Sequence, residues 1–79
     1  MVYLKKKEVT KDKVTYYYQP EKKGEFGIIT FTPTGKEIFI VEKVAESSGY
    51  YSYLLHAYTQ LYEFYQSDNY PEEKLVKWG

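Results

Sequence analysis

Residues 25–43 read EFGIITFTPTGKEIFIVEK, two runs rich in β-branched and aromatic residues on either side of Pro33-Thr34-Gly35. Proline is preset for the second position of a type I turn, and glycine suits the left-handed residue that closes a three-residue hairpin loop. The sequence therefore predicts an antiparallel hairpin between residues 25–32 and 36–43, with Thr32 facing Lys36. The facing pairs would be Thr30–Ile38, Ile28–Ile40 and Phe26–Glu42 on one face, and Phe31–Glu37, Ile29–Phe39 and Gly27–Val41 on the other.

The residues before this hairpin predict two further strands. Residues 2–9 are weakly strand-like, and residues 14–19, VTYYYQ, combine side chains that suit a half-buried pleated surface. Polar turns separate these segments, so the strands form a meander with the first strand at its edge. The hairpin is apolar on both faces over most of its length, unlike a sheet with one wet side. Gly27, inside a strand, predicts an aromatic ring packed against bare backbone.

Residues 47–66 predict one long helix, whose first turn Ser47 or Ser48 can cap. Apolar residues recur every third or fourth position on one side, and polar residues lie opposite, which is helical periodicity. The apolar side holds Tyr50, Leu54, Ala57, Tyr58, Leu61, Phe64 and Tyr65, and Tyr51, Tyr53, Leu55 and Tyr62 widen it. The polar stripe holds Ser52, His56, Thr59, Gln60, Glu63 and Ser67.

We therefore expect one α+β domain over residues 1–79: a three- to four-stranded antiparallel meander followed by one long helix packed on the sheet (ββββα). The tail after the helix carries Leu75, Val76 and Trp78, which are not typical of a free terminus. We expect this short C-terminal tail to dock on the fold, with the second sheet face as a site for it.

The composition excludes several chemistries. The chain has no cysteine, which removes disulfides, thiol catalysis and cysteine-containing metal sites. No apolar run approaches the roughly 20 residues that span a bilayer, and no secretory signal follows the N-terminal lysines, so we expect a cytoplasmic protein away from membranes. The net charge is zero, but residues 1–23 carry an excess of lysine and the remainder an excess of acids.

Catalytic and metal-binding residues are sparse. Ser52 and His56 lie one helical turn apart, as a nucleophile and its base could. They bring no third residue to orient the ring and no oxyanion hole, so a solvated polar face is the favoured interpretation. One histidine without cysteine makes no metal site, and the glycines form no phosphate-binding motif. We expect no enzyme activity, no cofactor and no metal.

The lysines near the N-terminus have two interpretations. Lys5, Lys6 and Lys7 on an edge strand would discourage pairing with other chains. Alternatively, cationic and aromatic side chains of the first two strands would bind single-stranded nucleic acid by stacking and charge. That surface would comprise Lys5, Lys7, Lys11, Lys13, Tyr16, Tyr17 and Tyr18. Zero net charge and the absence of arginine argue against nucleic acid.

The 11 tyrosines favour a different partner. Tyrosine is enriched in binding surfaces, and those of the predicted helix spread over more than one of its faces, so some should be exposed. The candidate partner-binding surface comprises Tyr51, Tyr53, Tyr62, Tyr17 and Trp78. The leading hypothesis is a non-enzymatic interaction module that binds a protein partner or a second copy of itself.

Overall fold

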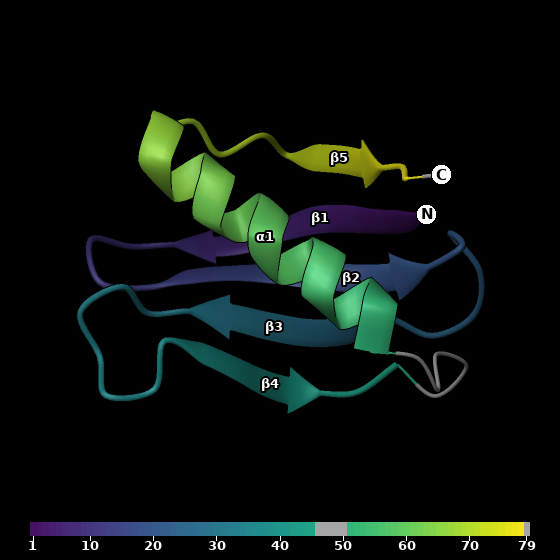
Figure 1. The fold of residues 1–79 in the computed structure, drawn as a ribbon, viewed down its shortest axis with the longest axis horizontal. Helices are drawn as coiled ribbons and strands as arrows, with labels where there is room; N and C mark the ends of the chain where they lie inside the picture. The colour runs from purple at the N-terminus through teal and green to yellow at the C-terminus, as the bar shows by residue number, and fades with distance from the viewer. Residues whose placement is uncertain (46–50, 79) are drawn as a thin grey trace.

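The computed structural model describes residues 1–45 and 51–78, and these form a five-stranded antiparallel sheet with one helix across one face (Figure 1). The elements are β1 (Val2–Val9), β2 (Val14–Pro20), β3 (Gly27–Phe31), β4 (Phe39–Lys43), α1 (Tyr51–Ser67) and β5 (Glu73–Val76). The strand order is β4-β3-β2-β1-β5. The predicted α+β class and the ββββα order are confirmed, and the C-terminal tail adds one strand to them.

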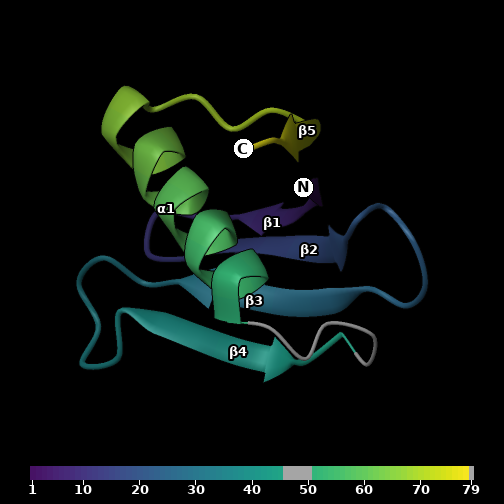
Figure 2. The same ribbon diagram turned by 45° about the vertical axis from the view of Figure 1, so that its right-hand side comes forward.

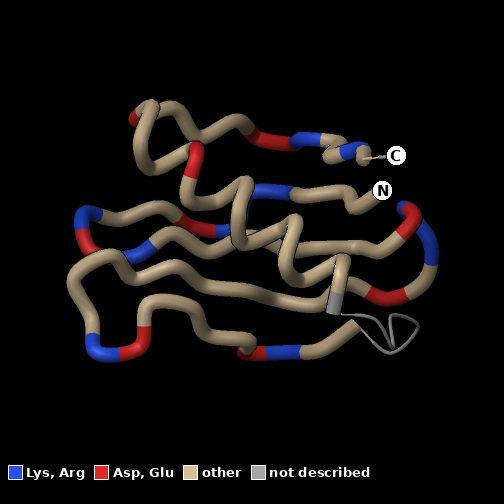
Figure 3. Tube along the Cα trace, viewed as in Figure 1, with Lys and Arg blue, Asp and Glu red and all other residues tan. Residues whose placement is uncertain are grey.

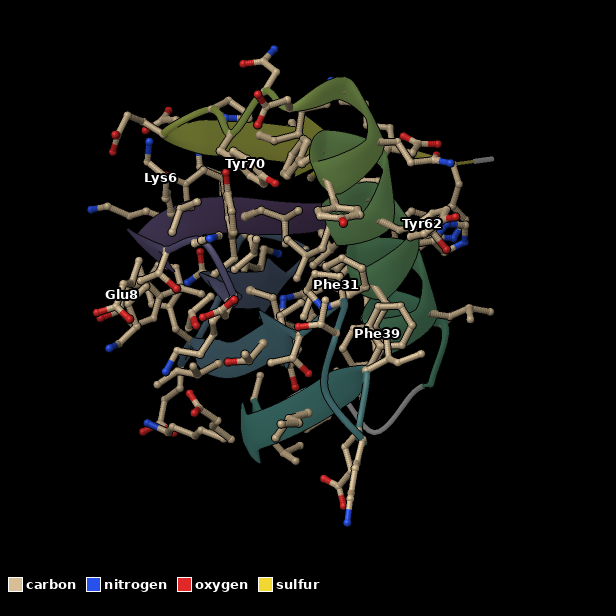
Figure 4. The ribbon with its side chains drawn as sticks, turned by 90° about the vertical axis from the view of Figure 1, so that its left-hand side faces the viewer. Lys6, Glu8, Phe31, Phe39, Tyr62 and Tyr70 are labelled. Atoms are coloured by element: carbon tan, nitrogen blue, oxygen red, sulfur yellow. The ribbon has the colours of Figure 1, made fainter. Side chains whose placement is uncertain are left out.

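The tail docks at the sheet edge rather than on the second face. Strand β5 pairs with β1, so that Tyr3 faces Leu75 and Lys5 faces Glu73. Strand β1 is therefore an inner strand, and the interpretation of Lys5 to Lys7 as protection of a sheet edge is wrong. Lys6 shows the consequence: its ammonium lies 2.9 Å from Glu72 and donates to the carbonyl of Tyr70, which holds the start of the tail against β1 (Figure 4).

The hairpin forms, but in a register shifted by two residues from the predicted one. Thr30 faces Ile40, and the amide of Thr32 donates to the carbonyl of Ile38 at 2.7 Å. The loop therefore spans residues 33–37, and the hydroxyl of Thr32 donates to the carbonyl of Glu37. Gly35 does not adopt the expected left-handed conformation. Because side chains alternate with a period of two, a shift of two residues keeps each one on its predicted face.

The core lies between the sheet and α1. Buried side chains come from all of β1, β2, β3 and α1, and the largest are the rings of Tyr16 and Tyr18. Each phenol finds a partner: the Tyr16 hydroxyl donates to the carbonyl of Pro71 at 2.6 Å, and that of Tyr18 accepts from the amide of Ala45 at 3.0 Å. A Cβ at Gly27 would collide with the Tyr18 ring, as predicted for a glycine inside a strand.

Helix α1 crosses the sheet diagonally and ends at Ser67, where Asp68 takes a left-handed conformation and the amide of Asn69 donates to the carbonyl of Phe64 (Figure 1). The predicted buried side is confirmed at Ala57, Leu61 and Phe64. Tyr65 was placed on that side by its spacing but is nearly half exposed. Ser47, Ser48 and Tyr50 lie outside the described residues.

The second sheet face carries no cover from the described elements, because α1 lies on one side only (Figure 2). We call this the open face. Its centre is protected from water locally, since Thr15 and Thr30 are buried there and their hydroxyls share a hydrogen bond of 3.1 Å. The second sheet face, named above as a site for the tail, is therefore not covered by it, because β5 pairs at the sheet edge.

Candidate functional site

The diagonal course of α1 divides its exposed surface into two flanks, one toward β5 and one toward β4. On the β5 side, Trp78 stacks on His56 with ring centroids 3.9 Å apart and planes 12° apart, and it meets the ring of Tyr53 edge-on at 5.8 Å. The Tyr53 hydroxyl donates to Glu21 at 3.1 Å. We call Tyr53, His56 and Trp78 the docked flank, because the end of the chain packs against the helix here.

The flank toward β4 is built from a second helical stripe. Leu55, Tyr58, Tyr62 and Tyr65 follow one another at three- and four-residue spacing, so they lie along one side of α1. The Tyr58 ring packs on Phe39 at 4.5 Å, and the rings of Tyr62 and Tyr65 meet Phe31 edge-on at 6.0 and 5.4 Å. Phe31 itself is buried and contacts Phe39 at 5.2 Å, so these rings form one connected cluster (Figure 4).

This second flank remains largely uncovered. Large apolar side chains on it and along β4 expose between 42% and 65% of their surface. Ile38 shares the open face with Ile40, and we call the other five the bare flank: Phe39, Val44, Leu55, Tyr62 and Tyr65. These five are half of the ten exposed large hydrophobic residues in the part of the chain that the structure describes. Charge is scarce here, because Glu63 is the one charged residue in α1 and the charges of the hairpin lie at its ends (Figure 3).

The two edges of the sheet also differ. The β5 edge is four residues long and carries Glu73 and Lys74, with Pro71 just before it. Charges, proline and short length are the features by which sheet edges avoid pairing with other chains. In β4 the first three residues, Phe39 to Val41, are apolar, and charge begins only at Glu42. The edge of the sheet whose first three residues are uncharged therefore borders the bare flank.

The open face carries a smaller aromatic group. Phe26 lies 6.2 Å from the ring of Tyr3 and 5.8 Å from that of Tyr17, and the ammonium of Lys22 lies 5.1 Å from the centre of the Tyr3 ring. Around these rings both signs of charge occur, because Lys5 faces Glu73 across the strands. The open face therefore offers rings without a cationic surface to accompany them.

The residues of the predicted nucleic-acid surface do not come together. Tyr16 and Tyr18 are fully buried beneath α1, whereas Tyr17 points to the open face, because successive residues of a strand alternate. Of the lysines, only Lys5 faces Tyr17 across the strands. Lys11 and Lys13 belong to the turn after β1, and Lys7 lies at the bulge of that strand. The predicted surface of seven residues is therefore not formed as one patch.

The residues of the predicted partner-binding surface fall in three places. Tyr62 belongs to the bare flank, Tyr53 and Trp78 contact each other on the docked flank, and Tyr17 lies on the open face. The side chain of Tyr51 lies outside what the structure describes. Sequence reasoning missed Phe39, Leu55 and Tyr65 as surface residues, although the recurrence of apolar residues at 55, 58, 62 and 65 was a usable signal for a second helical stripe.

The side chains whose pKa values are shifted take part in contacts that stabilise the fold. Burial raises the pKa of the Tyr16 hydroxyl far above its usual range, with Glu72 adding to the effect, and burial raises the pKa of Tyr58 as well. The amino terminus and the Tyr53 hydroxyl both donate to Glu21 and lower the pKa of that carboxyl. These groups hold the fold together at the tail, at the helix and at the N-terminus.

Polar chemistry elsewhere is limited. A shallow groove of about 460 Å³ runs between the end of α1 and β5, with Gln60, Glu63 and Lys74 among its lining. Within residues 1–45 and 51–78, no group of three or more histidines and acids could hold a metal ion. Over the same residues, no helix is long and apolar enough to cross a membrane.

The chain matches no protein-family model, no curated protein and no solved structure.

Proposed function

We infer that this chain is a non-enzymatic interaction module that binds a protein through the bare flank. The single observation that carries this proposal is the concentration of exposed apolar side chains there, beside a sheet edge with unpaired backbone. Monomeric proteins rarely expose contiguous apolar patches larger than about a few hundred Å², and larger patches mark interaction sites. Tyrosine and phenylalanine are the residue types that protein interfaces favour at their centres.

The arrangement of the rings adds to this support. Phe39, Tyr62 and Tyr65 are each held by a ring contact to a neighbour, so their orientation is largely fixed before any partner arrives. A preordered aromatic surface loses less side-chain entropy on binding than a flexible one. The bare flank is therefore both apolar and prepared for contact.

The packing of His56 supports the part of the proposal that the chain is not an enzyme. The ring of this histidine lies flat against Trp78, which occupies one of its faces and gives it a packing role. Ser52, its proposed nucleophilic partner, is exposed on the solvent side of α1. A nucleophile and base in a productive pair would share a walled site, which an exposed serine does not have.

A photo-crosslinking experiment tests the proposal in the cells that make the protein. A benzophenone-bearing phenylalanine replaces Tyr62 or Phe39 in the bare flank, and, as matched aromatic controls, Tyr17 on the open face or Trp78 on the docked flank. We expect protein adducts at 62 and 39 and none at 17 and 78. Adducts confined to 17 or 78, or no adduct at any of the four positions, would show that the bare flank is not the binding surface.

A further inference from the structure

The outer edge of β4 presents a defined set of backbone groups. The amide of Thr32 donates to the carbonyl of Ile38, and Thr30 faces Ile40, so Ile38 and Ile40 direct their backbone groups toward β3. In an antiparallel ladder the intervening residues direct theirs the other way. The amides and carbonyls of Phe39 and Val41 therefore point out of the sheet edge, where no described strand pairs with them.

These four outward groups are complementary to themselves. If a second β4 runs antiparallel to the first about a two-fold axis through Ile40, Phe39 of each copy faces Val41 of the other. Both pairs are then of the hydrogen-bonded type, which exchanges two bonds per pair, and all four groups of each edge are used. An axis through Phe39 or Val41 leaves half of them unpaired. The bulge that follows Val41 comes after this segment and does not interrupt it.

The side chains around the axis are complementary as well. Phe39 of each copy meets Val41 of the other on the helix side of the joined sheet, because both residues face β3 partners on that side. Ile40 meets its own counterpart on the open face. The apolar residues that meet at the centre favour this register.

The same operation also covers the bare flank. Residues that face each other across an antiparallel pair point to the same side of the sheet, so the two copies of α1 lie on one side of the joined sheet. Their stripes of Leu55, Tyr62 and Tyr65 then point toward each other from the two sides of the joined β4 strands. An isolated foreign strand would satisfy the backbone of β4 but would bring no apolar helix to cover that stripe.

We propose that the partner of the bare flank is a second copy of this chain, joined through β4 in the register centred on Ile40. This proposal rests on the function inferred above and names its partner. A standard interface takes about 800 Å² from each partner. That is roughly 15% of the 5196 Å² surface of this chain. The five residues of β4 are too few to supply such an area alone, so the helix stripe must contribute.

Engineered cysteines test the register directly, because the chain has no cysteine of its own. In the proposed dimer the two copies of residue 40 form a non-hydrogen-bonded pair with Cα atoms about 4.5 Å apart, which a disulfide can bridge. Ile38 is the matched control: it is also an isoleucine on β4's side of the hairpin and is exposed, yet its two copies would lie about 14 Å apart. Ile40→Cys and Ile38→Cys are oxidised in a glutathione buffer and compared, after circular dichroism confirms that each folds.

We expect Ile40→Cys to form the disulfide-linked dimer at least about tenfold faster than Ile38→Cys, because only residue 40 is held next to its counterpart. The unaltered chain should rise in mass from 9.4 kDa toward twice that value between about 10 μM and 1 mM, and Ile40→Lys, which places two like charges together, should abolish the rise. Equal oxidation rates for the two cysteine variants, or a mass that stays monomeric, would overturn the proposal. If Tyr62 nevertheless crosslinks to a different protein, the inferred function stands and self-pairing alone is wrong.

Discussion

On the side of α1 that faces β5, the end of the chain returns to the fold: β5 pairs with β1, and Trp78 stacks on His56. On the side that faces β4, nothing in the described residues returns, and Phe39, Tyr62 and Leu55 stay between 42% and 65% exposed. Both sides carry aromatic rings in contact with one another. The difference shows that an aromatic helix surface becomes part of the core only where another segment of the chain covers it.

The two flanks contribute differently to the stability of the folded chain. A domain of this size buries only about 60% of the surface that its unfolded chain exposes, so its margin of stability is small. The docked flank adds apolar contacts and strand pairing to that margin. The aromatic rings of the bare flank are largely exposed, so their apolar surface adds to stability only when a partner covers it. We therefore expect changes on the two flanks to affect different quantities.

The largest effect should come from removing the docked segment altogether. A chain truncated after Tyr70 loses β5, the Trp78 stack, the ion pair of Lys6 with Glu72 and the acceptor of the Tyr16 hydroxyl. It also exposes the edge of β1. We expect a loss of about 3 kcal/mol or more in the free energy of unfolding, a large part of what such a small domain has. Urea unfolding followed by circular dichroism measures it, and an unfolding midpoint equal to that of the full chain would contradict the structural role of the tail.

A pair of single substitutions compares the two flanks more finely. Trp78→Ala removes a ring that is 36% exposed but contacts both His56 and Tyr53, and we expect a loss of about 1–2 kcal/mol in the free energy of unfolding. Leu55→Ala removes a side chain that is 65% exposed, and at low protein concentration it should change the same quantity by less than about 0.5 kcal/mol. Urea unfolding of both variants at micromolar concentration or below gives the comparison. Equal losses would show that Leu55 is packed in the monomer after all.

The elements of this fold with strong local patterns could be predicted from the sequence. The helix follows from its 3.6-residue period, and the strands from their β-branched and aromatic runs. The hairpin register could not, because the loop closes through the hydroxyl of Thr32 rather than through a left-handed Gly35. Strand β5 was not foreseen either, since Glu73 and Lys74 make its sequence look like a solvated loop. What makes it a strand is pairing with β1, some 70 residues away.

The sequence predicts which types of residue form the candidate site, but not where in the fold they lie. The exposure of Tyr62 was expected, and the spacing of Leu55, Tyr62 and Tyr65 carries the same information. No local pattern shows that Tyr53 and Trp78 would contact each other, because 25 residues separate them in the chain. The split of Tyr16, Tyr17 and Tyr18 between the two sheet faces follows from strand alternation, but which face α1 covers is decided by the whole sheet.

The smallest expected effect is a loss of stability at low pH through Glu21, which contacts Tyr53 of the docked flank. Glu21 accepts hydrogen bonds from the amino terminus and from the Tyr53 hydroxyl, and these contacts lower its pKa below the ordinary glutamate value of 4.5. A carboxyl whose pKa is lower in the folded state contributes stability above its unfolded pKa, and that contribution is lost as the pH falls through the folded pKa. We therefore expect a small drop in the urea midpoint of the unaltered chain between neutral pH and pH values below 4.5, beyond the drop shown by Glu21→Gln.

The comparison with Glu21→Gln isolates this contribution, because other carboxyls titrate in both proteins over the same range. Glu63, the one acid on α1, provides a second control: Glu63→Gln removes an exposed carboxylate that accepts a hydrogen bond of 3.2 Å from the side-chain amide of Gln60. It should follow the same acid profile as the unaltered chain. If Glu21→Gln and the unaltered chain lose stability in parallel, the hydrogen bonds to Glu21 do not hold Tyr53 in solution, and the docked flank depends on the Trp78 stack and on β5 alone.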